Sequence, residues 1–108
     1  MTNSGRPLEF GLFDWIDFET PEQVGARYQQ RMRMLEYADG AGFYCYHLAE
    51  HHLTSLSSTP SPAVFLAAAS QRTSRIRLGA LVFLLTLNHP VRLAQEICML
   101  DHLSGGPA

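Results

Sequence analysis

Residues 76–83, with the sequence IRLGALVF, form the strongest predicted β-strand of the chain. The segment is almost wholly apolar and has the length of a strand that is buried in a sheet. Gly79 indicates either a bulge or a close approach of the backbone to a ligand. A loop, residues 84–88, follows this strand and leads toward the next helix.

The helix after this loop is predicted from its capping residues. Asn88 or His89 is expected to cap it, and Pro90 suits its first turn. We expect the helix to run to about Leu103 and to end at the glycine pair of residues 105–106. Its predicted inward positions are Ala94, Ile97, Met99, Leu100 and Leu103.

A similar strand and helix begin the chain. Residues 9–13 predict a short strand that ends at a polar cluster, residues 14–17. Thr20 and Gln23 form the pattern of a capping box around Pro21, which predicts a helix start. The helix is expected to end at Gly40 and Gly42, with an inward face made of Val24, Tyr28, Met32, Leu35 and Ala38.

A third strand and helix lie between these two units. Residues 43–47, FYCYH, predict a strand buried on both faces, which favours a parallel sheet. Residues 48–61 are too long for a plain connection and form a candidate functional loop. Ser61 and Pro62 then predict the start of a helix over residues 63–71.

The spacing of the units decides between fold classes. The predicted strands start at residues 9, 43 and 76, which are 34 and 33 residues apart. Such alternation predicts an α/β fold with a parallel sheet, either doubly wound or a (β/α)8 barrel. No GxGxxG or P-loop motif follows the first strand, so a barrel is favoured.

The length indicates that such a barrel is incomplete in this chain. A closed barrel has eight units and about 250 residues, whereas the sequence supplies three predicted units in 108 residues. Another strand is expected near residue 108. The fold class is therefore three βα units of a TIM-type (β/α)8 barrel, and residues 1–108 are expected to form a single partial domain.

Composition excludes several classes of function. With 46% apolar and 17% charged residues, the chain is globular, and its net charge of −2 argues against nucleic-acid partners and anionic membranes. The sequence shows no signal peptide and no stretch of about 18 apolar residues, so a cytoplasmic protein is expected. Cys45 and Cys98 are expected to be reduced core residues.

The candidate site lies beyond the carboxyl ends of the predicted strands, where parallel α/β folds bind ligands. Glu50, His51 and His52 follow the second strand, and a histidine there could act as a general acid or base. The alternative is a solvated loop with a capping role. His89 could likewise either face the pocket or only cap its helix.

A metal centre is a weaker interpretation of the same segments. Asp14, Glu50 and His51 could converge as ligands, which would suit a metal-dependent hydrolase barrel. The histidines, at positions 47, 51, 52, 89 and 102, are not arranged to meet, so no metal site is predicted.

The motifs resemble those of the bacterial luciferase-like flavin monooxygenases. The similar segments are FGLFDW (10–15), AEHHLTSLSSTPSPAVFLAAASQRTSRIRLG (49–79) and NHPVRLAQEICMLDHLSGG (88–106), in the order found in that family. The resemblance implies a (β/α)8 barrel. It also implies use of reduced FMN, often supplied by a partner reductase, or of a deazaflavin, and activation of O2 to oxidise a small organic substrate.

The resemblance assigns roles to individual residues. His51 corresponds to the histidine at the flavin face that supports catalysis, and Glu50 and His52 flank the same pocket. Leu81 and Val82 correspond to a cis non-prolyl peptide that packs against the isoalloxazine ring. The cofactor-binding residues expected are thus Glu50, Leu81 and Val82.

The chain departs from the family pattern at its end. Family members continue from SGG into an arginine and a fourth strand, whereas residues 106–108 are Gly-Pro-Ala. Flavin-phosphate contacts come mostly from later strands, so an isolated fragment is expected to bind flavin poorly. The alternative function is a catalytically inactive truncated fragment that folds only by association, and a homo-oligomer is expected in either case. The substrate and the choice between FMN and deazaflavin stay open.

Overall fold

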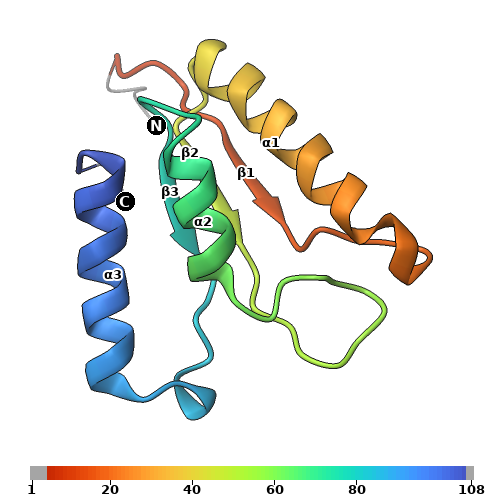
Figure 1. Ribbon diagram of the computed structural model, residues 1–108. Helices are drawn as coiled ribbons and strands as arrows, with labels where there is room; N and C mark the ends of the chain where they lie inside the picture. The colour runs from red at the N-terminus through yellow and green to blue at the C-terminus, as the bar shows by residue number, and fades with distance from the viewer. Residues whose placement is uncertain (1–4, 107–108) are drawn as a thin grey trace.

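The computed structural model describes residues 5–106, which form a three-stranded parallel sheet with helices (Figure 1). The strands are hydrogen-bonded in the order β1-β2-β3, and both pairs are parallel. The elements, in which η marks a 3-10 turn, are β1 (Gly11–Asp14), η1 (Pro21–Gln23), α1 (Val24–Gly40), β2 (Cys45–Leu48), α2 (Pro62–Ser70), β3 (Arg77–Ala80), η2 (Leu85–Leu87) and α3 (Pro90–Ser104).

The predicted fold class is confirmed over the described residues. Each strand is followed by a helix, and the three parallel strands point the same way in Figure 1. This is the arrangement of three successive βα units of a (β/α)8 barrel. The fourth strand predicted near residue 108 lies outside the described residues.

Local capping signals set the helix ends where the sequence predicts them. The side-chain oxygen of Gln23 accepts hydrogen bonds from the backbone N–H groups of Glu19 at 3.2 Å and Thr20 at 3.4 Å. The first turn is a 3-10 turn that continues into α1. Nδ1 of His89 accepts from the N–H of Val91 at 3.2 Å, so His89 caps α3. Gly105, with φ 75°, ends that helix in the left-handed conformation.

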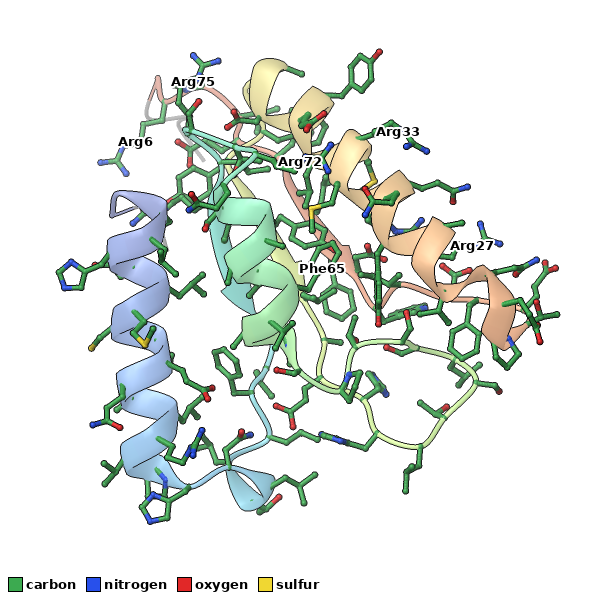
Figure 2. The ribbon with its side chains drawn as sticks, in the orientation of Figure 1. Arg6, Arg27, Arg33, Phe65, Arg72 and Arg75 are labelled. Atoms are coloured by element: carbon green, nitrogen blue, oxygen red, sulfur yellow. The ribbon has the colours of Figure 1, made fainter. Side chains whose placement is uncertain are left out.

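The core lies between the sheet and the helices. Tyr46, Leu48 and Leu78 are buried on the helix-facing side of the sheet, and Phe65 reaches from α2 into the space beside α1 (Figure 2). Its ring centroid is 5.9 Å from that of Tyr28 and 6.4 Å from that of Tyr46. The other buried members are Ile16, Met32, Leu35, Ala38, Leu66, Ala69, Ile76 and Leu100.

The opposite side of the sheet carries no helix in the described part of the chain. Alternation along the strands places on it Gly11, Phe13, Cys45, His47, Arg77 and Gly79, which are paired in register. We call this side the inner face. Cys45 and His47 are half-buried and Phe13 is exposed. The prediction that residues 43–47 are buried on both faces is therefore wrong for the inner face, because the described helices cover only the other one.

The strands are shorter than predicted. β3 ends at Ala80 and not at Phe83. The N–H of Leu81 still donates to the carbonyl oxygen of Leu48 at 3.0 Å, but β2 ends at Leu48. The residues after Leu81 therefore have no strand partner in β2 and leave the sheet.

The predicted inward face of α3 is largely wrong. Leu93 and Leu100 are buried, whereas Ala94, Ile97, Met99 and Leu103 are exposed. α3 packs against α2, and Leu100 joins the buried core cluster, while the other predicted positions are left uncovered. Cys98 is also exposed, which corrects its placement in the core, and Cys45 is only half-buried. Both thiols are free, as predicted.

The loop between β2 and α2, residues 49–61, is held against the end of β1. The N–H of Ser58 donates to the carbonyl of Ile16 at 3.1 Å, and the hydroxyl of Thr59 donates to that of Ala49 at 2.6 Å. Ser57 also donates from its hydroxyl to the carbonyl of Trp15. Residues 57–59 are buried.

Among the described helices, none is both long and apolar enough to cross a membrane.

Candidate functional site

A pocket of about 430 Å³ opens at the carboxyl ends of the three strands. Phe13 reaches it from β1, and the segments after β2 and β3 form the rest of its lining. The lining residues are Phe13, Ala49, Glu50, His51, His52, Leu81, Val82, Leu84 and Leu87. The structure therefore brings all the sequence-predicted site residues, His51, Glu50, Leu81 and Val82, to one place.

One side of the pocket is an apolar wall made of Phe13, Leu81, Val82 and Leu87. Each of these side chains is more than half exposed, with relative accessibilities from 51% to 63%. The peptide bond between Leu81 and Val82 is cis, as the resemblance implied. An exposed apolar surface of this kind suits an aromatic ring system.

Glu50 is buried at the junction of the pocket segments. Its side chain is only 3% exposed. Oε1 accepts hydrogen bonds from the N–H of Leu84 and from Nδ2 of Asn88, each at 3.2 Å, and Oε2 lies 2.7 Å from Nε2 of His52. The carboxylate thus has polar partners from the segment after β2 and from the segment after β3, as a buried charge requires.

His51 differs from its two neighbours. Its backbone N–H donates to the carbonyl oxygen of Thr59 at 3.1 Å, which fixes the chain at this point. The residue is exposed and lines the pocket, while His52 is bound to Glu50. Glu50 is buried and hydrogen-bonded, so the alternative of a merely solvated loop does not describe it. His51 is exposed, so its side chain is open to a ligand in the pocket.

Asp14 belongs to a different part of the molecule. Its carboxylate faces α1, where Oδ2 accepts from the hydroxyl of Tyr46 at 2.8 Å and from Nε of Arg31 at 2.7 Å. Burial, reinforced by the charge of Asp14, raises the pKa of Tyr46. Burial alone would lower the pKa of Arg31, but the hydrogen bond and charge of Asp14, with help from Asp17, raise it.

The proposed convergence of Asp14, Glu50 and His51 on a metal ion is not found. Asp14 lies on the helix-facing side of the sheet and is bound to Arg31. The described residues contain no group of three ligand side chains placed to hold a metal ion. The parity of the strand could have indicated this, since Asp14 shares a face with Leu12 and not with Phe13.

Sequence reasoning missed the part that Asn88 plays in the site. It was expected only as an alternative helix cap, yet its amide binds both Glu50 and the carbonyl oxygen of Leu84, the latter at 2.7 Å. Its position just beyond the loop after β3 was the available signal. A polar residue there can reach the segment after β2, because parallel strands end at the same edge of the sheet.

These features define the class of protein: three βα units of a (β/α)8 barrel, with a pocket at the carboxyl edge of the sheet. The family model for luciferase-like monooxygenases matches residues 8–107. The chain therefore belongs to the luciferase-like monooxygenase family.

Curated relatives support the same assignment. An uncharacterized protein, y4wF, of Sinorhizobium fredii is 52% identical over 101 residues, which cover 94% of this chain and 29% of the relative. Limonene 1,2-monooxygenase of Rhodococcus erythropolis is 36% identical over 106 residues, 98% of this chain and 27% of the relative. The flavin-dependent trigonelline monooxygenase oxygenase component of Acinetobacter baylyi is 27% identical over 100 residues, 92% of this chain and 28% of the relative.

Solved structures share the fold. Monooxygenase RslO1 from Streptomyces bottropensis has a TM-score of 0.85 and 33% identity, covering 93% of this chain and 31% of that one. The oxygenating constituent of 3,6-diketocamphane monooxygenase from Pseudomonas putida, in complex with FMN, has a TM-score of 0.83 at 24% identity, covering 94% and 28%. A coenzyme F420-dependent tetrahydromethanopterin reductase from Methanopyrus kandleri reaches 0.72 at 24%, covering 95% and 26%. The chain spans less than a third of each of these proteins.

Proposed function

We propose that residues 1–108 form the N-terminal, flavin-facing part of a flavin-dependent monooxygenase that acts with reduced FMN and O2 on a small organic substrate. The observation that carries the proposal is the pocket itself, which places an exposed imidazole, His51, beside an apolar wall at the carboxyl edge of the sheet. Family membership supports it, as do the relative described as flavin-dependent and the similar structure in complex with FMN.

The pocket lining fits the ring of a flavin better than its phosphate. The apolar wall, which includes Leu81 and Val82, offers an exposed surface to an isoalloxazine ring. Within the described lining, the polar groups are Glu50 and the two imidazoles of His51 and His52, and no arginine is present to bind a phosphate. We therefore assign the ring, and not the phosphate, to this part of the protein.

Each residue has a distinct role in the proposed reaction. A bound reduced flavin supplies the electrons for the activation of O2. His51 holds or transfers a proton at the open side of the pocket, as a histidine can near neutral pH. Leu81 and Val82 support the ring and keep water from its face.

The expected partners follow from the same proposal. Two similar proteins are described as an oxygenase component and an oxygenating constituent, which supports a separate flavin reductase as the partner that delivers reduced flavin. A deazaflavin is the alternative cofactor, supported by the similar F420-dependent reductase. The substrate lies within the class of small organic molecules.

The test is a titration of the 108-residue chain with FMN, in oxidised and photoreduced forms. Trp15 is the single tryptophan, and its ring lies edge-on to Phe13 of the apolar wall, with centroids 5.7 Å apart. We expect saturable quenching of tryptophan emission and a higher melting temperature. Because the phosphate is not assigned to this pocket, lumiflavin should bind as well as FMN. A folded chain that shows no saturable quenching at millimolar flavin overturns the proposal.

A second measurement tests the proposal if the 108-residue chain alone binds flavin only weakly. Residues 8–106 can replace the aligned segment of the Acinetobacter baylyi oxygenase component, and oxidation of trigonelline with reduced flavin can be measured. Turnover by the chimera supports the proposal. A chimera that melts cooperatively and binds flavin but has no turnover contradicts it.

The second candidate function is a chain without activity that folds only by association. The observation in its favour is the amount of exposed apolar surface, including Leu53, Leu85 and Met99 on three different segments. Sedimentation and circular dichroism at several concentrations test it. Secondary structure that is lost on dilution, together with a homo-oligomer at high concentration, supports this candidate. A cooperative monomer contradicts it.

A further inference from the structure

We propose that Glu50 is a positioning residue, which sets the apolar wall at a fixed distance from His51, and that it makes no direct contact with the cofactor. This inference rests on the proposed function, and it revises the role that the family resemblance gave to Glu50. The observation behind it is that the buried carboxylate of Glu50, in the segment after β2, is hydrogen-bonded to the segment after β3.

The carboxylate has little left to offer a ligand. Its side chain is 3% exposed, and both oxygens already have partners in the chain. Oε2 is paired with His52, while Oε1 receives the N–H of Leu84 and the amide of Asn88. A ligand in the pocket would have to displace one of these partners in order to reach Glu50.

These bonds join residues that are distant in sequence and belong to the two segments, after β2 and after β3, that supply most of the pocket lining. Leu84 and Asn88 are 34 and 38 residues from Glu50. The amide of Asn88 also donates to the carbonyl oxygen of Leu84 at 2.7 Å, which closes the intervening turn η2. Leu87, a member of the apolar wall, belongs to η2, and Leu81 and Val82 are separated from this turn by residues 83–84.

Glu50 is also covalently next to His51, whose backbone is fixed by Thr59. Movement of the segment after β3 relative to Glu50 would therefore change the spacing between His51 and the part of the apolar wall that this segment supplies, Leu81, Val82 and Leu87. Removal of the carboxylate would leave the N–H of Leu84 without its acceptor. The amide of Asn88 would lose its bond to Glu50 and keep only its bond to the carbonyl oxygen of Leu84. An unsatisfied buried donor is costly, so we expect the segment to shift or to open locally.

The first experiment needs no flavin. Amide hydrogen exchange of the 108-residue chain is compared for wild type, Glu50→Ala and Glu96→Ala, the last being a half-exposed glutamate on α3. Glu50→Ala should speed exchange at Leu84 by about tenfold and leave Leu35 in the core of α1 unchanged. Glu96→Ala should change neither. Unchanged exchange at Leu84 in a folded Glu50→Ala chain overturns the inference, whether or not the chain binds flavin.

The second experiment separates positioning from direct contact. Flavin affinity and the visible circular dichroism of bound flavin are measured for Glu50→Ala, Asn88→Ala, the double variant and Glu50→Gln. Positioning predicts that each alanine variant weakens affinity by about tenfold and alters the dichroism, and that the double variant loses little more. Gln keeps an acceptor for Leu84 and Asn88, so Glu50→Gln should stay within about threefold of wild type.

Direct contact of the charge with the cofactor gives the opposite pattern. The losses of Glu50→Ala and Asn88→Ala would then add, and Glu50→Gln would be as weak as Glu50→Ala. Either result overturns the inference. If wild type binds no flavin, the proposed function fails, and the exchange experiment alone decides the role of Glu50.

Discussion

The hydroxyl of Tyr46 donates a 2.8 Å hydrogen bond to Oδ2 of Asp14 on the helix-facing side of the sheet. The same oxygen accepts from Arg31 of α1, so a buried network joins β1, β2 and α1 on the side away from the pocket. Two clusters of polar side chains near the ends of these strands thus stabilise different parts of the structure. Asp14, Tyr46 and Arg31 hold a helix to the sheet, whereas Glu50, His52 and Asn88 join the segments after β2 and β3 that line the pocket.

Tyr46→Phe should destabilise the chain by about 1–2 kcal/mol, because Asp14 loses a buried hydrogen bond while the ring still packs against Phe65. The free energy of unfolding is measured in urea. Tyr37→Phe is the matched control, since Tyr37 is 80% exposed, and it should have no effect. Equal stability of the two variants would show that the network contributes nothing.

Asp39 gives the chain a dependence of stability on acid pH. Burial would raise the pKa of this carboxyl, but hydrogen bonds from the N–H groups of Ile76, Arg75 and Ser74 and from the Ser74 hydroxyl lower it overall. A group whose pKa is lowered by folding contributes stability above its unfolded value, near 3.8, and this stability is lost as pH falls through the folded value.

Asp39→Asn should therefore be less stable than wild type at pH 7, by about 2 kcal/mol, since the three backbone donors lose a charged acceptor. The difference should shrink as pH falls below 3.8, where Asp39 of the unfolded chain becomes protonated, and should vanish below the lower pKa of the folded chain. Urea unfolding between neutral and strongly acid pH tests this, with the exposed Glu22→Gln as a control. A difference that is independent of pH would contradict the account.

Gly11 is expected to be intolerant of a side chain. A Cβ added there would lie 2.5 Å from Sγ of Cys45, so Gly11→Ala should destabilise by about 1–3 kcal/mol. Replacement of the sulfur in the double variant Gly11→Ala, Cys45→Ala should recover much of the loss, which a double-mutant cycle measures. Gly25→Ala is the control, because a Cβ there meets open space, and it should stabilise by roughly 0.5–1 kcal/mol. Purely additive losses would exclude the clash.

His51→Ala should lower kcat by about 100-fold in the chimera described above, with flavin affinity changed little, because the imidazole is assigned to proton transfer. Steady-state turnover and a flavin titration are measured in parallel. His102→Ala, an exposed histidine in the last turn of α3, is the control and should not affect turnover. Unchanged turnover in His51→Ala would remove His51 from the mechanism.

Local signals in the sequence predicted most of the fold. The Thr20, Pro21 and Gln23 pattern, the His89-Pro90 start of α3 and the glycine end of that helix all act through hydrogen bonds within a few residues. The strand spacing predicted a parallel sheet, since each of the three units repeats the same local pattern of a strand followed by a helix. The end of β3 could not be predicted this way, because it depends on where β2 stops.

The candidate site was predicted as a place but not as a set of contacts. The segment of residues 50–52 and the Leu81–Val82 peptide carry family motifs, and the parallel topology brings them to one edge. The sequence did not show how the roles of residues 50–52 differ. Glu50, His51 and His52 are adjacent in sequence, yet the first is buried and bound while the second faces the pocket.

The sequence by itself therefore determined the alternation of strands and helices, their caps and the edge of the sheet at which a ligand can bind, because all of these depend on short-range hydrogen bonding and periodicity. Only the tertiary structure decided that Asp14 turns toward α1, that α3 buries Leu93 and Leu100 but leaves Met99 exposed, and that Glu50 joins Leu84 and Asn88. These outcomes depend on which surfaces meet across gaps of tens of residues, and a buried charge takes the partners that the packed chain brings within hydrogen-bonding distance.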